Sequence, residues 1–304
     1  MTGHIAVTGA SGFVGRALLH RAVKDGWKGV GIVRSAASAR RVSEAGGRPV
    51  VLPGLEAEAL AGSLAGCTAV AHLAQIGAER DARYEDVNVG GTRAVIAACR
   101  LAGVRRIVFF SGLGVAHYGM RRRCTNPYFL SKLTAEVELY RSGLEVRVFR
   151  PSYVVGPGDG FVTWVTRDIL SGCVELPGDG CYRMQPIGVD DAAAVILASA
   201  TGGPELATLD LVGPEPLAAR DLVSRLAAAL GLGGRAIPWR IEKIALEAAE
   251  RAASSGGFHG MLPDELDCLL CDEVGEHGPL EELLGRPLLS VDSALRIAVT
   301  PRAV

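Results

Sequence analysis

The chain has 304 residues, 49% hydrophobic and 21% charged, with a formal net charge of −1 at pH 7. This composition is typical of a packed globular protein, and the charge offers no general attraction to nucleic acid or an anionic membrane. The longest apolar run, residues 192–200, is too short to span a bilayer. Seven cysteines without framework spacing favour a reducing compartment. A strand at the very start argues against a signal peptide, so we expect a cytoplasmic protein.

Short apolar strands alternate with helical segments through the first half of the chain. The six strands are predicted at residues 4–8, 29–34, 48–52, 67–74, 105–111 and 144–151. The clearest helices are 12–24 and 128–141, the second with Asn126 as its cap. This alternation predicts an α/β fold built on a Rossmann-type, doubly wound parallel sheet.

After Pro151 the alternation breaks. Two Gly/Pro-rich loops flank a short helix, one more strand is predicted at 207–213, and helices are predicted at 217–230 and beyond Pro238. We therefore expect a nucleotide-binding domain of residues 1–155, joined by 187–214. A smaller, mostly helical substrate-binding region would comprise residues 156–186 and 215–304.

A glycine-rich loop, TGASGFVG, follows the first strand and opens the first helix. Gly9 allows a tight turn, Gly12 lets the backbone approach a pyrophosphate, and Gly15 lets the helix pack closely on the strand. The free N–H groups at the helix N-terminus would then face the phosphates. The loop predicts dinucleotide binding by Thr8, Gly9, Ser11, Gly12, Phe13, Val14 and Gly15.

The residue at the end of the second strand bears on the choice of dinucleotide. An acidic residue there would bind the adenosine ribose and favour NAD(H), but this chain has Arg34, followed by Ser35. Arginine can hold a 2′-phosphate with two hydrogen bonds, and serine can add a third. The alternative is a solvated arginine at a strand end. The sequence favours NADP(H) as cofactor, with NAD(H) as the alternative.

Tyr128 and Lys132 lie four residues apart on a predicted helix, so their side chains share one face. A phenol transfers protons poorly near neutral pH because its pKa is about 10, and a neighbouring ammonium lowers that value. Tyr128 would then exchange a proton with a substrate oxygen, while Lys132 adjusts its pKa and holds the nicotinamide ribose. The alternative is a coincidental pair on an exposed helix.

Six motifs together resemble the extended short-chain dehydrogenase/reductase superfamily, which includes NAD-dependent epimerases and dehydratases. They are TGASGFVG, HLA at 72–74, VNVGGT at 87–92, FFSG at 109–112, YFLSK at 128–132 and RPSYVVGPGD at 150–159. The C-terminal half is similar to one atypical branch, the relatives of the complex I accessory NAD(P)H-binding subunit. The segments that carry this second similarity are 186–196, 209–223 and 264–296.

The resemblance implies further roles for particular residues. Leu73 and Ala74 would line the cofactor, Asn88 would support it, and Pro151 and Val154 would lie near the nicotinamide. Tyr128 and Lys132 would be the catalytic pair, acting on a small-molecule substrate. A homodimer through the helices at 81–102 and 126–142 is expected by analogy.

The chain departs from the family pattern at two positions. The family usually has two hydroxyl residues after the fifth strand, but here Ser111 is followed by Gly112. The usual donor to the substrate oxygen is therefore absent unless Ser111 replaces it. Losing such a donor costs about 10²–10³ in rate. Gly54 stands where an aspartate often contacts adenine, so adenine recognition is less well specified.

Three weaker signals in the sequence can each be interpreted in two ways. The basic run at 121–123 is a solvated surface or a site for an anionic substrate group. His117 is an additional acid or base, or a loop residue. Cys268 and Cys271 form a CxxC without a second ligand pair, which we interpret as structural neighbours on a helix rather than a metal site.

The sequence leaves three functions open. The first is an NADP(H)-dependent oxidoreductase that interconverts a carbonyl and a secondary alcohol, with Tyr128, Lys132 and Ser111 as catalytic residues. The second is an NAD-dependent epimerase or dehydratase that returns the hydride to the same substrate. The third is an NAD(P)H-binding structural or regulatory protein with weakened catalysis.

Overall fold

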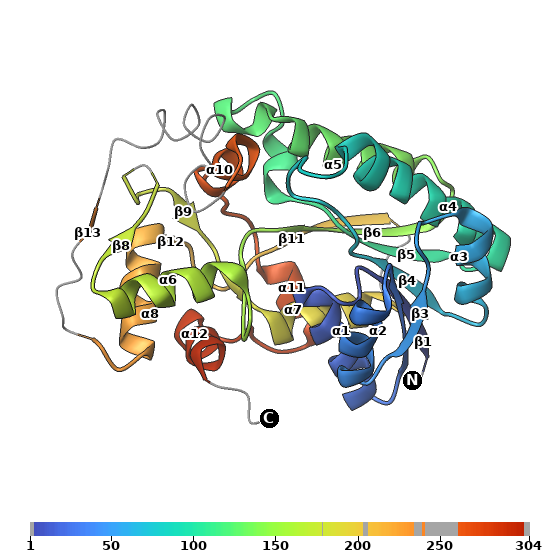
Figure 1. Cartoon of the computed structure of the whole chain (residues 1–304), viewed down its shortest axis with the longest axis horizontal. Helices are drawn as coiled ribbons and strands as arrows, with labels where there is room; N and C mark the ends of the chain where they lie inside the picture. Colours follow the sequence, from blue (N-terminus) through green and yellow to red (C-terminus); the bar gives the residue numbers. More distant parts are fainter. Residues whose placement is uncertain (1–2, 178, 203–205, 234–238, 241–260, 301–304) are drawn as a thin grey trace.

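The structure is a computed structural model, which describes residues 3–177, 179–202, 206–233, 239–240 and 261–300. Its centre is a seven-stranded parallel sheet with the strand order β11-β6-β5-β4-β1-β2-β3 (Figure 1). The strands are β1 (His4–Thr8), β2 (Lys28–Val33), β3 (Arg48–Val51), β4 (Ala69–His72), β5 (Arg106–Phe110), β6 (Glu145–Pro151) and β11 (Leu206–Leu211). The order in which strands are added to the sheet reverses between β1 and β4. Ligands of such sheets bind at this point, outside the carboxyl ends of the strands.

Helices cover both faces of the sheet, which confirms the predicted doubly wound α/β fold (Figure 1). One layer consists of α1 (Phe13–Lys24), α2 (Ala36–Glu44), α7 (Val189–Ser199) and α11 (Gly278–Leu284). The other consists of α3 (Ala57–Leu64), α4 (Gly91–Ala102) and α5 (Pro127–Tyr140), with a π-helical turn at Glu85–Gly90 before α4. Fully buried Leu18 and Ile196 belong to the first layer, and Leu60 and Leu139 to the second. Burial of such side chains contributes about 1.5–3 kcal/mol each.

The C-terminal half builds a second hydrophobic cluster beside the sheet. Its helices are α6 (Gly160–Ser171), α8 (Ala219–Ala229), α10 (Pro263–Leu269) and α12 (Val291–Val299). The short strands are β7 (Val154–Val155), β8 (Val174–Glu175), β9 (Arg183–Met184), β10 (Ile187–Gly188), β12 (Leu217–Ala218) and β13 (Trp239–Arg240). The 3₁₀ turns Leu113–His117 and Arg122–Thr125 precede α5. Trp164, Met184, Leu222 and Leu295 form part of this cluster.

The predicted domain boundaries remain a prediction, but the hydrophobic contacts add detail to them. The elements at 187–199 and 206–211 pack with the sheet, as predicted for the nucleotide-binding domain. The helix α11 falls within the predicted 215–304 region, but it packs against α7 and β11. The helix predicted at 217–230 begins at Ala219, because Leu217 and Ala218 pair with β9. The helices predicted directly after Pro238 fall mostly outside the described residues.

The helix that carries the tyrosine–lysine pair starts where the sequence predicts. The Asn126 side chain accepts a hydrogen bond from the Phe129 N–H (3.0 Å), and Pro127 occupies the first turn. Such a cap contributes about 1 kcal/mol to helix stability. The cap therefore fixes the start of α5, and with it the position of Tyr128.

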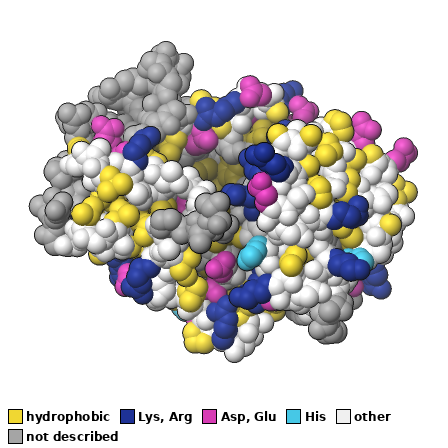
Figure 2. All heavy atoms as spheres, turned by 60° about the horizontal axis from the view of Figure 1, so that its bottom comes forward, with side chains coloured by type: hydrophobic (Ala, Val, Ile, Leu, Met, Phe, Trp, Pro, Cys, Tyr) yellow, Lys and Arg dark blue, Asp and Glu magenta, His cyan; other side chains and the backbone are white. Residues whose placement is uncertain are grey.

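Acidic and basic side chains are interspersed on the face shown in Figure 2, in agreement with the formal net charge of −1. Within the described ranges, no helix is long and apolar enough to cross a membrane. Leu101 on α4 and Leu130 and Val137 on α5 are exposed. They lie on the helices of the expected homodimer contact, which stays a prediction.

Candidate active site

The glycine loop makes a tight turn at the carboxyl end of β1, which is a central strand of the sheet. Gly9 has φ +68°, and the Gly12 N–H donates to its carbonyl (3.0 Å). A Cβ at Gly9 would lie 2.8 Å from the Ala74 nitrogen, and one at Gly15 only 2.5 Å from the Gly9 oxygen. Side chains at these two positions would therefore push the loop away from β4 and α1. Gly12 begins α1 without a side-chain cap, which leaves the first helical N–H groups available to a ligand.

A cavity of about 700 Å³ lies along this loop. Among the predicted residues it is lined by Thr8, Gly9, Ser11, Gly12, Arg34, Leu73 and Ala74. The elongated dinucleotide fits such a lining, since small residues face its phosphates and apolar ones its bases. Gly54 also lines the cavity, and a Cβ there would meet nothing within 4 Å.

Two residues missed by the sequence analysis, Ser38 and Arg41, line the same cavity together with Arg34. They project from α2, three residues apart, and the Arg41 guanidinium donates to the Ser38 hydroxyl (3.1 Å). The Ser35 hydroxyl accepts from the Ser38 N–H (3.3 Å) and caps α2, and its predicted hydrogen bond to the cofactor stays a prediction. The run SAASARR contained the signal, because helical spacing places 38 and 41 on one face.

Asn88 is buried and does not line either cavity, so its support of the cofactor site is indirect. Its side-chain oxygen accepts from the Ile76 N–H (2.9 Å), and its amide donates to the Ser131 hydroxyl (2.9 Å). It thereby joins the segment after β4 to α5. Thr8 acts similarly, since its hydroxyl oxygen accepts from the Ala74 N–H (3.2 Å).

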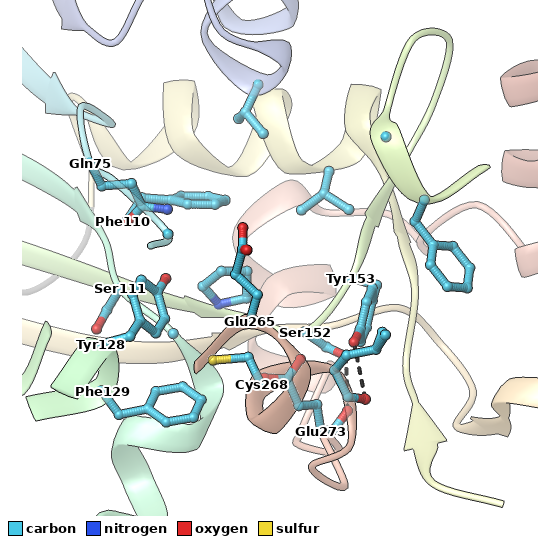
Figure 3. Close-up of a pocket in the computed structure, with 18 of the residues that line it drawn as sticks. Gln75, Phe110, Ser111, Tyr128, Phe129, Ser152, Tyr153, Glu265, Cys268 and Glu273 are labelled. Atoms are coloured by element: carbon cyan, nitrogen blue, oxygen red, sulfur yellow. Dashed lines mark hydrogen bonds between the residues drawn. The ribbon is translucent and has the colours of Figure 1, made fainter. Parts of the chain in front are cut away.

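A second cavity, of about 630 Å³, lies between the sheet and the C-terminal cluster (Figure 3). Val14, Ser111, Tyr128, Pro151 and Val154 of the predicted residues line it. Aromatic side chains make up much of the remaining wall, namely Phe110, Phe129, Tyr153, Phe161 and Trp164. Phe13, Gly15, Ser35, Asn88 and Lys132 line neither cavity.

Gln75, which the sequence analysis also missed, lines both cavities and marks the point where they meet. Lys132 lies buried behind it. The Lys132 ammonium donates to the Gln75 side-chain oxygen (2.5 Å) and to the Phe110 carbonyl (2.6 Å), and lies 4.3 Å from the centroid of the Phe109 ring. Burial lowers the pKa of Lys132 to about 7, against a smaller raising effect of Glu136.

The pKa of Tyr128 differs from the sequence-based expectation. Burial raises this pKa above its usual value, and Cys268 and Glu273 raise it further, whereas a hydrogen bond with Gln75 lowers it. The predicted lowering by Lys132 is wrong for this structure, because desolvation dominates and the ammonium is held by Gln75 and Phe110. Tyr128 is therefore a protonated phenol at neutral pH.

The hydroxyl of Ser111 does not have the expected role of a donor to a substrate oxygen. It donates to the buried Glu136 carboxylate (2.5 Å), which is in turn paired with Arg150 (2.6 Å). A hydroxyl has one donor, so Ser111 does not donate to a substrate oxygen in this arrangement. Gly112 is extended, with φ −149°, and an added Cβ would lie 3.7 Å from the Tyr128 ring. The nearest atom to that Cβ would be on the Phe129 ring, at 3.4 Å, so the structure has room for a Cβ at Gly112.

Of the weaker sequence signals, Cys268 lines the second cavity, whereas Arg121 and Arg123 line neither cavity. The Arg121 guanidinium donates to the Asp272 carbonyl (3.4 Å), and Arg123 pairs with Asp267 (3.0 Å). Both arginines therefore contact the segment at 267–272, and the two readings of the basic run, a solvated surface or a site for an anionic substrate group, stay predictions. His117 lines neither cavity, and burial lowers its pKa.

The CxxC lies at the end of α10 rather than within it. The helix ends at Leu269, so Cys271 follows it, with its sulfur 3.6 Å from that of Cys124. In the part of the chain that the structure describes, no group of His, Cys, Asp or Glu is arranged to hold a metal ion.

Glu273 is the residue at this site that sequence reasoning had least chance of finding. It belongs to the irregular segment between α10 and α11, yet it lines the second cavity and is 7% exposed. Burial raises the pKa of its carboxyl to about 8. In the sequence, CDEVGEH reads as an exposed charged loop, so no local pattern indicated its burial.

Comparison with known proteins agrees with this fold and site. The sequence model of the NAD dependent epimerase/dehydratase family matches residues 5–206, and the chain belongs to that family. The 2-alkyl-3-oxoalkanoate reductase of Stenotrophomonas maltophilia (strain K279a) is 32% identical over 254 residues, 75% of this chain and 76% of the relative. A farnesyl-dihydroquinoline-oxide ketoreductase of Stigmatella aurantiaca is 28% identical over 267 residues, 82% of this chain and 78% of the relative.

A solved structure shows the same fold over almost the whole chain. The structure of MoeE5 in complex with UDP-glucuronic acid and NAD superimposes with a TM-score of 0.74 at 22% identity, covering 97% of each chain. The protein is therefore an NAD(P)-dependent enzyme of the extended short-chain dehydrogenase/reductase type, an oxidoreductase or epimerase. The similarity to the complex I branch stays a prediction.

Proposed function

We propose that this enzyme is an NADP(H)-dependent oxidoreductase that interconverts a carbonyl group and a secondary alcohol on a small organic molecule. The observation that carries the proposal is the junction of the two cavities. Gln75 lines both and binds the Lys132 ammonium (2.5 Å), while Tyr128 lines the cavity on the substrate side. A proton donor thus stands where the dinucleotide groove opens into an apolar pocket.

The relatives support net redox chemistry over epimerisation, since two of them are named reductases. The lining of the second cavity points the same way. Its described residues include no Lys, Arg or His, whereas the diphosphate of a nucleotide sugar is an anion that such side chains bind. Membership of an enzyme family argues against a purely structural protein.

The chain's own groups suggest how the cofactor would be held. The glycine loop and the α1 N-terminus would hold the pyrophosphate, and Arg34, Ser38 and Arg41 the 2′-phosphate. The bound nicotinamide would supply or accept the hydride. The three polar side chains lie on the groove near one another, which favours the phosphorylated dinucleotide.

Tyr128 would donate its proton to the carbonyl oxygen as the alcohol forms, and take it back in the reverse direction. Burial keeps the phenol protonated, which suits reduction. Lys132, with a pKa of about 7, is partly charged at neutral pH and lies one amide away from the phenol. Gln75 would therefore pass the influence of the ammonium to Tyr128 by hydrogen bonding.

Replacing Tyr128 by phenylalanine tests the acid–base role. Tyr128→Phe should lower kcat for NADPH-dependent ketone reduction by about 10²–10⁴-fold, without weakening NADPH binding measured by fluorescence. Tyr140→Phe is the matched control, since it removes a hydroxyl from the same helix at an exposed position. Turnover that survives in Tyr128→Phe would remove the assigned role.

Replacing Arg41 by alanine tests the choice of dinucleotide. Arg41→Ala and Arg34→Ala should each raise the Kd for NADPH about 10- to 100-fold and leave that for NADH nearly unchanged, because only NADPH carries the 2′-phosphate. Arg40→Ala is the control, since its side chain is 85% exposed and pairs with Glu44. Equal losses for both dinucleotides would contradict the NADP(H) assignment. Tightly bound NAD released on denaturation would instead favour the epimerase alternative.

A further inference from the structure

Glu273 is held in a fixed position on the wall of the substrate-side cavity (Figure 3). Its N–H donates to the Arg183 carbonyl (2.8 Å), and its own carbonyl accepts from the Ser152 hydroxyl (2.9 Å). These two hydrogen bonds fix the backbone of Glu273 through its N–H and its carbonyl. The carboxyl, by contrast, makes no hydrogen bond or ion pair with any residue that the structure describes, although the residue is 93% buried. A buried polar group without a partner costs free energy, so a ligand that supplies one would recover it.

The groups around this carboxyl are neutral at pH 7. Tyr128, Tyr153 and Cys268 are each coupled to it electrostatically, and burial raises the pKa of all three. The same holds for the neighbouring thiols of Cys124 and Cys271. Burial also raises the pKa of Glu273 to about 8, so the empty pocket holds an uncharged acid.

The second carboxyl on the wall, that of Glu265, already has partners. It pairs with Arg80 (2.5 Å) and accepts from the Leu262 N–H (2.8 Å) at the start of α10. Since the described lining contains no Lys, Arg or His, the pocket offers no cation to an anionic substrate group. Of the two carboxyls on this wall, that of Glu273 is therefore the one without a partner among the described residues.

Three aromatic rings stand on the same cavity wall. Tyr153 and Phe161 have their ring centroids 5.6 Å apart, and Phe161 and Trp164 5.5 Å apart in an edge-on arrangement. Aromatic faces attract cations, and the attraction is stronger where water is excluded. Tyr153 is the ring of the three that interacts electrostatically with Glu273. A carboxyl near an aromatic ring, in a described lining without a competing cation, suits an ammonium group.

We propose that Glu273 binds a protonated amine, so that this enzyme acts on carbonyl or alcohol compounds that carry a basic nitrogen. That the substrate is a carbonyl or alcohol compound rests on the proposed function. The binding of an amine by Glu273 can be measured without any turnover. When the ammonium enters, its charge favours the carboxylate, the Glu273 proton leaves to solvent, and a charge-assisted hydrogen bond forms. A substrate carboxylate or phosphate in the same place would lie beside the Glu273 carboxyl, without a cationic side chain in the described lining to pair with it.

The test compares three ketones that differ only in the group remote from the carbonyl. They are 4-(aminomethyl)acetophenone, 4-(hydroxymethyl)acetophenone and 4-acetylbenzoate, titrated by calorimetry at pH 7 into the full chain saturated with NADP⁺ or NAD⁺. Measurements in PIPES and ACES, which have different ionisation enthalpies, give the number of protons released. We expect the amine to bind about 10- to 100-fold more tightly than the alcohol and to release close to one proton. The alcohol should release none, and the benzoate should bind most weakly.

Glu273→Gln should lose the preference for the amine and the proton release together. Glu276→Gln, an exposed position on the same segment, should keep both. Equal binding of amine and alcohol, failure of all three to bind, binding without proton release in the parent protein, or an unchanged preference in Glu273→Gln would overturn the proposal. Amine binding that passes these tests without any NADPH oxidation would support the amine site and count against the oxidoreductase instead.

Discussion

The buried carboxyl of Glu273 should make the stability of the protein depend on pH in a calculable way. Burial raises its pKa from 4.5 to about 8. Because the folded-state value is the higher one, the folded protein binds more protons than the unfolded chain between these two pH values. The free energy of unfolding therefore falls as pH rises through this window and levels off above it. The difference between the two pKa values corresponds to about 5 kcal/mol at full ionisation.

Glu273→Gln removes this titration while keeping the shape of the side chain. The free energy of unfolding of the variant, relative to the parent, should increase by about 4 kcal/mol between pH 5 and pH 9. Urea unfolding of the cofactor-free protein, followed by tryptophan fluorescence at each pH, measures this difference. Glu276→Gln should show no such trend, because that position is exposed. A difference between Glu273→Gln and the parent that stays constant across the range would refute the reasoning.

Two further predictions concern neighbouring positions. Gly112→Ser should raise kcat for ketone reduction about 10-fold or more, since an added Cβ would lie 3.7 Å from the ring of Tyr128, the proposed proton donor, and the hydroxyl would restore a donor; an unchanged or lower rate would contradict this. Gly114→Ser is the control that should lower the melting temperature instead, because its Cβ would lie 2.3 Å from a phenylalanine ring. Burial raises the pKa of both Cys124 and Cys271, so at pH 7 a thiolate-specific reagent should label them far more slowly than the exposed Cys181, as peptide mass spectrometry would show. Labelling at equal rates would mean that the two thiols are accessible.

The structural features that were predicted correctly depend on residues close together in the sequence. The turn at Gly9 and the packing at Gly15 follow from a strand, a loop and a helix in succession. The start of α5, which carries Tyr128 and Lys132, follows from its asparagine cap. The alternation of strands and helices likewise predicted the parallel sheet.

The parts that were missed depend on contacts between distant segments. Gln75 and Lys132 are hydrogen-bonded although 57 positions separate them in the sequence. Glu273 lines the second cavity although it follows β11, the last strand of the sheet along the chain. The direction of the Tyr128 pKa was predicted wrongly for the same reason. A lysine four residues away is visible in the sequence, but the degree of burial, which raises the pKa here, depends on the whole fold.

The segment that carries Glu273 is attached to the body of the protein at several neighbouring positions. The Gly275 N–H donates to the Gln185 side chain (2.9 Å), and the Glu276 N–H to Asp210 (3.2 Å) at the end of the sheet. A Cβ at Gly275 would lie 2.4 Å from the Asp210 carboxylate, so position 275 is closed to substitution. The side chain at position 273, by contrast, has no partner among the described residues, and its backbone alone is held. Exchanging this one side chain, for instance Glu273→Gln, would change which ligand groups the pocket favours while the backbone bonds of the segment stay in place, which makes position 273 the natural starting point for redesigning substrate choice.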